Sequence, residues 1–163
     1  MIIVVLAAPT VPVLLAGLWW AGCAVPLAFI DAQVHRLPNV ITMPAAAGVL
    51  ALLTIDAVVA DRWEPLLSAT ICAAVATAVF VSIGLVLGRR GMGLGDAKLI
   101  LSMTALLGWW GWGAAFGAVF FGFLGAGFVG VVLLASGRVR RGAHIPMGPF
   151  FIAGAVLMLA LPA

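Results

Sequence analysis

Five short polar stretches interrupt a chain that is otherwise apolar almost throughout. Only 8% of the 163 residues are charged, against about 25% in an average soluble domain. So few charges cannot cover a soluble domain of this size with a polar surface. Because a membrane helix needs about 20 apolar residues, the apolar segments predict an all-α integral membrane protein.

The apolar segments predict a bundle of about six transmembrane helices in a single domain, residues 1–163. The expected helices cover approximately residues 11–30, 40–60, 66–88, 97–107, 114–136 and 149–161. The chain carries no Lys or Arg before Arg36, whereas a signal peptide begins with a basic region. The first segment is therefore expected to be a retained helix.

The basic residues gather at alternate polar stretches. Seven of the eight lie in or beside the first, third and fifth stretches, namely Arg36, Arg89, Arg90, Lys98, Arg138, Arg140 and Arg141. Since loops rich in Lys and Arg face the cytoplasm, both termini are predicted on the non-cytoplasmic side. The basic residues are too few and too spread out for a nucleic-acid surface, so no nucleic-acid partner is predicted. Membrane lipid is the predicted partner of the apolar surface.

Two of the five acidic residues, Asp31 and Asp96, lie at membrane boundaries on the same predicted face. Ionisable groups at membrane depth are costly, which raises a functional hypothesis. The plainer alternatives are a helix N-cap for Asp96 and a simple helix end for Asp31. Asp61 and Glu64 are expected in a solvated outer loop beside Arg62, and Asp56 is expected to cap or fray a helix end.

Glycines at every second position precede Asp96. Gly91, Gly93 and Gly95 leave the backbone bare there. Bare backbone lets an extended peptide approach closely and supplies strand-like hydrogen bonds. A helix end alone needs no such spacing, so the pattern favours a peptide-binding site.

Three motifs resemble those of type IV prepilin peptidases. "GMGLGDAKLI" (residues 91–100) contains the GxGD motif of intramembrane aspartyl proteases, and its continuation resembles the second aspartate motif of the family. "FIDAQVHRLPNVIT" (residues 29–42) resembles the first aspartate motif. "IPMGPFFIAGA" (residues 145–155) is similar to the C-terminal Pro-x-Gly-Pro segment. The motifs occur in order and the resemblance covers nearly the whole chain.

The resemblance implies a multi-pass peptidase of the inner membrane that removes the basic leader of prepilins and pseudopilins at the cytoplasmic face. It implies that Asp31 and Asp96 are catalytic, and makes Gly93, Gly95 and Lys98 candidates for substrate binding or support. Classical members also N-methylate the product and carry a domain with CxxC motifs. This chain has no CxxC and resembles the short form of tight-adherence (Flp-type) pilus systems, so methylation is not predicted.

Hydrolysis by two carboxylates needs one ionised and one protonated group. Asp96 is expected at a helix N-terminus, where the macrodipole favours negative charge, and Asp31 at a helix C-terminus. Asp96 is therefore the expected base and Asp31 the expected acid, an assignment that fails if Asp31 lies beyond a helix N-terminus. Lys98 either snorkels to the membrane surface or contacts the substrate or tunes the charge of Asp96.

No cofactor or metal site is predicted, because His35 and His144 have no partner at ligand spacing. Cys23 and Cys72 are expected to be buried small hydrophobes without a disulfide.

Two other functions stay open. One is a non-catalytic transporter or pilus-assembly component, in which a proton-carrying carboxylate would lie in mid-membrane. The other is a preflagellin-type signal peptidase.

The tryptophans at 109, 110 and 112 predict an interfacial aromatic belt, and the GxxxG formed by Gly113 and Gly117 predicts packing inside the bundle.

Overall fold

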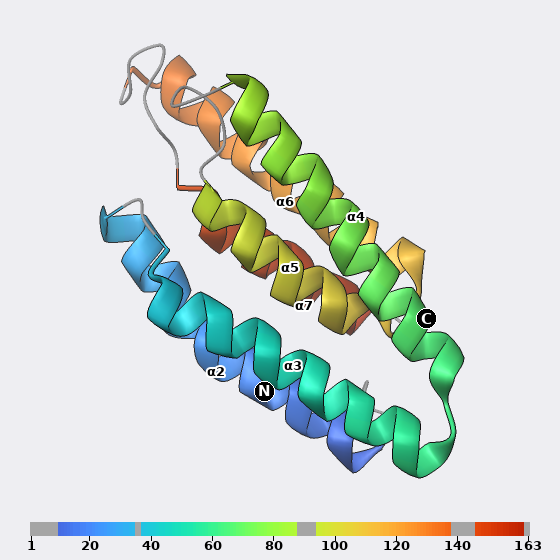
Figure 1. The fold of residues 1–163 in the computed structure, drawn as a ribbon. Helices are drawn as coiled ribbons and strands as arrows, with labels where there is room; N and C mark the ends of the chain where they lie inside the picture. Colours follow the sequence, from blue (N-terminus) through green and yellow to red (C-terminus); the bar gives the residue numbers. More distant parts are fainter. Residues whose placement is uncertain (1–9, 35–36, 88–93, 138–145, 162–163) are drawn as a thin grey trace.

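The computed structural model describes residues 10–34, 37–87, 94–137 and 146–161. Within these ranges the chain forms a helical bundle (Figure 1). The helices are α2 (Val11–Val34), α3 (Asn39–Ala60), α4 (Trp63–Leu87), α5 (Leu94–Gly108), α6 (Trp112–Ala135) and α7 (Gly148–Ala160). The predicted all-α bundle of six helices is thereby confirmed.

Among the helix ends that differ from the predicted ones, two involve the aspartates. Helix α2 continues to Val34, so that Asp31 lies inside its last turn instead of after it. Helix α5 begins at Leu94, which places Asp96 in its first turn. The polar residues near these ends do not break a helix, and α2 has room to continue because the next proline is Pro38.

Consecutive helices run antiparallel, and α5 lies at the centre of the bundle (Figure 1). It packs against all five other described helices. Its side chains are accordingly buried on all sides, including Leu99, Ile100, Met103, Leu106 and Leu107. This enclosure makes the short fourth apolar segment the core of the fold.

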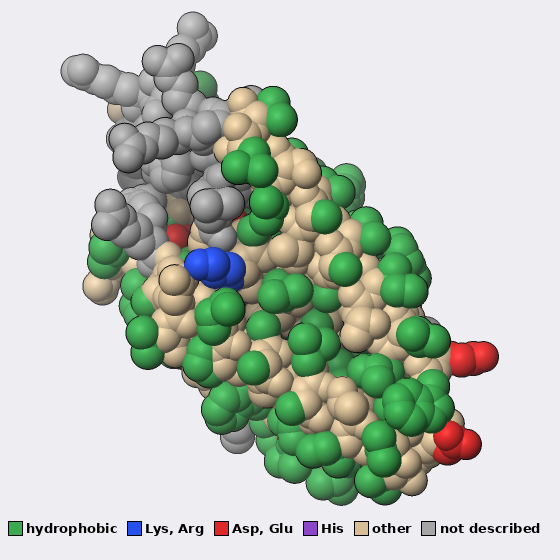
Figure 2. Space-filling model, in the orientation of Figure 1, with side chains coloured by type: hydrophobic (Ala, Val, Ile, Leu, Met, Phe, Trp, Pro, Cys, Tyr) green, Lys and Arg blue, Asp and Glu red, His purple; other side chains and the backbone are tan. Residues whose placement is uncertain are grey.

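Four helices, α2, α3, α4 and α6, are long and apolar enough to cross a membrane. Helices α5 and α7 have 15 and 13 residues, or roughly 22 and 20 Å at about 1.5 Å per residue. Helices α4 and α6 project beyond the starts of α5 and α7 at one end of the bundle (Figure 1). Figure 2 shows hydrophobic side chains covering the visible face between charged groups at the two ends, as a lipid-facing surface requires.

Glycines bring α6 and α7 close together. A Cβ atom at Gly154 would lie 2.3 Å from the carbonyl oxygen of Ala118, and one at Gly117 would lie 2.9 Å from the end of Met158. Gly117 therefore packs inside the bundle, as predicted for this half of the GxxxG. Gly113 has open space around it.

A buried polar cluster lies at the end of the bundle opposite the starts of α5 and α7. Asp56 is only 1% exposed, and its Oδ2 pairs with Arg62 Nη2 at 2.8 Å. The Thr10 hydroxyl donates to Asp56 Oδ1, and the Arg62 guanidinium lies 5.7 Å from the ring centre of Trp109. The expectation that Asp56 caps or frays a helix end is wrong, because Arg62 folds back over it.

The predicted interfacial aromatic belt is wrong for Trp109, which belongs to this buried cluster. Trp109 is buried beneath Arg62, whereas Trp112 is about half exposed. The buried position of Trp109 follows from its place directly after the enclosed helix α5. Both cysteines are free thiols in separate helices, with Cys72 fully buried and Cys23 half-buried.

Candidate active site

Asp31 lies in the last turn of α2 and is 5% exposed. Its Oδ2 accepts a hydrogen bond of 2.8 Å from the backbone N–H of Gly148, the first residue of α7. The first N–H groups of a helix have no partner within that helix, and the N-terminus carries partial positive charge. The start of α7 therefore supplies both a donor and a favourable field for a negative charge on Asp31.

The contact between α7 and Asp31 leaves no room for a side chain at position 148. A Cβ atom there would lie 2.7 Å from Oδ2 of Asp31 and 3.1 Å from its Cγ. Glycine is thus the residue that allows the backbone to reach the carboxylate. Pro149 follows within the first turn, where its fixed φ suits a helix start.

Asp96 lies in the first turn of α5 and is half-buried. Helices α2, α5 and α7 pack against one another, and α2 ends at the end of the bundle where α5 and α7 begin (Figure 1). Both aspartates consequently belong to contacting helices at one end of the bundle. Each also lies at a helix N-terminus, Asp96 in that of α5 and Asp31 against that of α7.

The expected division of roles between the aspartates loses its basis. It rested on Asp31 lying at a helix C-terminus, where negative charge is disfavoured. Asp31 is indeed in the last turn of α2, but its carboxylate accepts the N–H at the start of α7. The assignment of Asp31 as the acid and Asp96 as the base is therefore withdrawn.

Gly95 has a packing role that the glycine pattern did not predict. A Cβ atom at this position would lie 3.2 Å from the Cβ of Leu37, a buried residue between α2 and α3. The absence of a side chain lets the first turn of α5 sit close against the start of α3. Gly91 and Gly93, the other glycines of the motif, lie outside the described residues.

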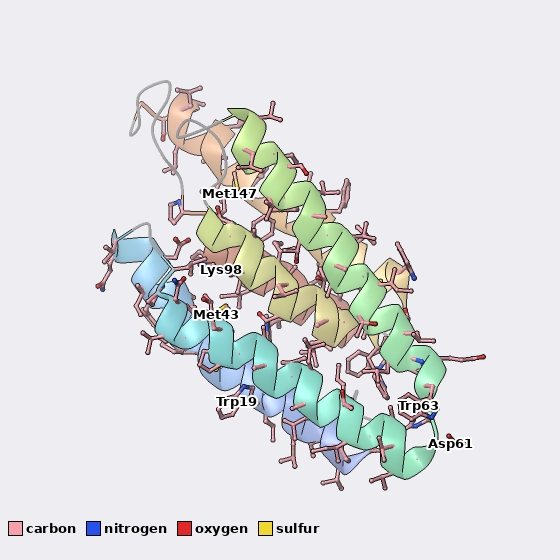
Figure 3. All side chains as sticks on the ribbon, viewed as in Figure 1. Trp19, Met43, Asp61, Trp63, Lys98 and Met147 are labelled. Carbon is pink, nitrogen blue, oxygen red and sulfur yellow. The ribbon has the colours of Figure 1, made fainter. Side chains whose placement is uncertain are left out.

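Lys98 is half-buried, and its ammonium donates to the side-chain oxygen of Asn39 at 2.5 Å. Asn39 is the first residue of α3, so this bond joins the starts of α3 and α5. Figure 3 shows Lys98 and Met147 at the same end of the bundle, with Asp61 and Trp63 at the opposite end. Asn39 was missed as a site residue, although it stands within the first motif.

Among residues 10–34, 37–87, 94–137 and 146–161, no three His, Cys, Asp or Glu side chains gather as a metal-binding group. His35 and His144 lie outside these ranges, as do the arginines at 36, 89, 90, 138, 140 and 141. The chemistry that the described site offers is that of two carboxylates, an ammonium group and backbone N–H donors.

Residues 10–135 match the model of the type IV leader peptidase family. The chain is similar to several proteins named prepilin leader peptidase/N-methyltransferase. It is 30% identical over 146 residues to that of Aeromonas hydrophila (89% of this chain, 49% of the relative) and 32% identical over 144 residues to that of Pseudomonas aeruginosa (87% and 47%). It is 34% identical over 112 residues to that of Dickeya chrysanthemi (59% and 38%).

The chain spans less than half the length of these curated relatives. No solved structure matches it. The matched segment contains both aspartates and four complete helices of the bundle besides α5, and it makes up well over half of the chain. This chain belongs to the type IV leader peptidase family.

Proposed function

We propose that this protein is a membrane-embedded aspartic endopeptidase that removes the leader from prepilin or pseudopilin precursors, with Asp31 and Asp96 as its catalytic residues. The observation that carries the proposal is the placement of these two carboxylates on contacting helices at one end of the bundle, each at a helix N-terminus. Family membership supports the same activity, and the names of the relatives support the substrate.

The reaction needs one carboxylate ionised and the other protonated. Two neighbouring carboxyl groups share a proton in this way because like charges disfavour each other, and the pair then titrates as a unit. The ionised group takes a proton from water, whose oxygen attacks the carbonyl carbon, while the protonated group donates to the carbonyl oxygen. The C–N bond then breaks as the amide nitrogen receives a proton, giving a leader carboxyl group and a new pilin amine.

Two further groups support the aspartates in this proposal. Lys98 is held by Asn39 across the starts of α3 and α5, which fixes the segment that carries Asp96. Gly95 lets the same segment pack against Leu37. Gly93 completes the bare backbone that would receive an extended substrate.

We place the aspartate end of the bundle at the cytoplasmic face of the inner membrane, with both termini on the other side. The basic residues near this end of each helix support that orientation. Leaders of prepilins begin in the cytoplasm, so the peptide bond would reach the aspartates from that side. The pilin's hydrophobic segment would lie in the surrounding lipid.

No observation favours a proton-carrying transporter. The most buried of the described carboxylates, Asp56, is paired with Arg62 and Thr10 near the opposite end of the bundle. A proton path would need a carboxylate in mid-membrane, whereas Asp56 lies in the last turns of α3.

The test is processing of a co-expressed tight-adherence prepilin, read by the intact mass of the pilin. Wild type should release the leader, and Asp31→Asn and Asp96→Asn should not. Asp61→Asn is the matched control, because Asp61 is exposed at the other end of the bundle. Wild-type protein that leaves several prepilins uncut, or active Asn variants at 31 and 96, would refute the proposal; an additional methyl mass would reveal methylation.

A further inference from the structure

Helix α7 reaches the site from outside the segment that the family model matches. The match ends at residue 135, and α7 begins at Gly148. The hydrogen bond from Gly148 to Asp31 joins residues 117 positions apart in the chain. The proposed catalytic carboxylate is thus held by a helix that neither aspartate motif includes.

Helix α7 is itself fixed against the rest of the bundle. Phe151 is 1% exposed, and its ring lies 5.8 Å from that of Phe80 and 5.1 Å from that of Phe123, both edge-on. A Cβ atom at Gly122 would lie 3.0 Å from the Phe151 Cα atom. These contacts fix how far the start of α7 extends toward Asp31.

The first turn of α7 leaves one donor for the carboxylate. The N–H groups of Phe150 and Phe151 both donate to the Met147 carbonyl at 3.1 Å. The N–H of Gly148 has no carbonyl one turn earlier within α7, and it donates to Asp31 instead. Hydrogen bonds to an ionised carboxylate are shorter and stronger than bonds between neutral groups.

We infer that the backbone N–H of Gly148 positions Asp31 for catalysis. It anchors Oδ2, so that the other oxygen, Oδ1, is held in one direction for water or substrate. Glycine is required at 148 because any side chain would occupy the place of Oδ2. This inference rests on the proposed peptidase function and names Gly148 as a positioning residue.

The decisive comparison is between Gly148→Ala and Gly117→Ala. Both place a methyl group in a tight contact of α7, but the one at 117 meets the flexible end of Met158. Because a displacement near 1 Å costs about 100-fold in rate, Gly148→Ala should lower kcat at least about 30-fold and leave KM within about threefold. Gly117→Ala should keep both values within about threefold of wild type.

A second measurement tests the contact even if Gly148→Ala folds poorly. The methyl group at 148 conflicts with the carboxylate of Asp31, so removing that carboxylate should relieve the conflict. Gly148→Ala should therefore lower Tm at least twice as much in the wild-type background as in the Asp31→Ala background.

Three outcomes would overturn the inference. They are a Gly148→Ala enzyme with kcat within threefold of wild type, an equal loss of kcat in Gly117→Ala, and Tm losses that simply add. Wild-type protein that cuts no prepilin would overturn the proposed function and this inference with it. Cleavage by wild type and by Gly148→Ala alike would overturn the inference alone.

Discussion

Replacing Arg62 by Met should destabilise the protein without stopping prepilin processing. The substitution keeps an apolar stem over Trp109 but leaves the carboxylate of Asp56 without its cation. Asp56 is 1% exposed and lies 2.8 Å from the guanidinium. Since the cluster lies at the end of the bundle opposite the two proposed catalytic aspartates, its loss should act on stability alone.

The magnitude follows from the burial of the two partners. Removing one member of a fully buried pair costs about 3–5 kcal/mol, chiefly because the other charge stays buried and uncompensated. The Arg62 side chain is 32% exposed, so solvent screening weakens the pair and the expected cost falls to about 2 kcal/mol. For a chain of this size that corresponds to a fall in Tm of about 4–8 °C.

The two cysteines provide the assay. Cys72 is fully buried and Cys23 is half-buried, so a Cys23→Ala background leaves Cys72 as a thiol that reacts with a fluorogenic maleimide only on unfolding. Adding Asp56→Asn to Arg62→Met removes the buried charge and should recover at least half of the lost Tm. A single variant within about 2 °C of wild type, or a double variant less stable than the single, would refute the argument. A folded Arg62→Met protein that cuts no prepilin would show instead that the cluster serves the reaction.

Five other substitutions test the packing and the support of the site. Gly154→Ala should lower Tm by more than about 4 °C, because its Cβ meets a backbone carbonyl, whereas Gly113→Ala should be neutral in the same thermal assay. Lys98→Met and Asn39→Ala should each lower kcat for prepilin cleavage several-fold, and the double variant should be no worse than either single, since one bond joins them. Gly95→Ala should leave Tm nearly unchanged, because the higher helix propensity of alanine offsets the close contact. It should lower kcat several-fold, because the added methyl group shifts the start of α5. An unchanged kcat would show that Gly95 does not support the site.

The helices were predictable because apolar run length carries most of the information about membrane spans. Polar stretches marked the connections, and the predicted helix ends lie within a few residues of the observed ones. The end of α2 differs from the predicted one because polar residues by themselves do not end a helix. Ala32, Gln33 and Val34 contain no helix breaker, so α2 continues and carries Asp31 inward.

The arrangement of the helices was not predictable from periodicity. In a soluble protein the apolar face of a helix shows which side packs against the core. In a membrane protein the lipid-facing surface of a helix is as apolar as the surface that faces the interior. The central position of α5 therefore left no pattern in its sequence. Its enclosure is visible only from its contacts with the other described helices.

The polar partners were missed for a different reason. The donor to Asp31 is a backbone N–H 117 residues away. Because every residue except proline has a backbone N–H, the sequence does not show which one will donate. Asp56 and Arg62 are close in sequence, but their pairing depends on the turn at Asp61, whose φ of 50° reverses the chain directly after α3. The sequence singles out Asp31 and Asp96 by their positions at predicted membrane boundaries and by the motif resemblance, but it does not show what surrounds them.

The shortness of α5 has a consequence for the supply of water. At roughly 22 Å, this helix falls about 8 Å short of a hydrocarbon layer of about 30 Å. Its first turn, which carries Asp96, therefore begins beneath the level that α4 and α6 reach (Figure 1). The first N–H groups of any helix have no partner within that helix and readily bind water, and the proposed hydrolysis would consume one water molecule for each bond cut. A central helix long enough to fill the bilayer would bury the two proposed catalytic aspartates away from the water that this reaction would need.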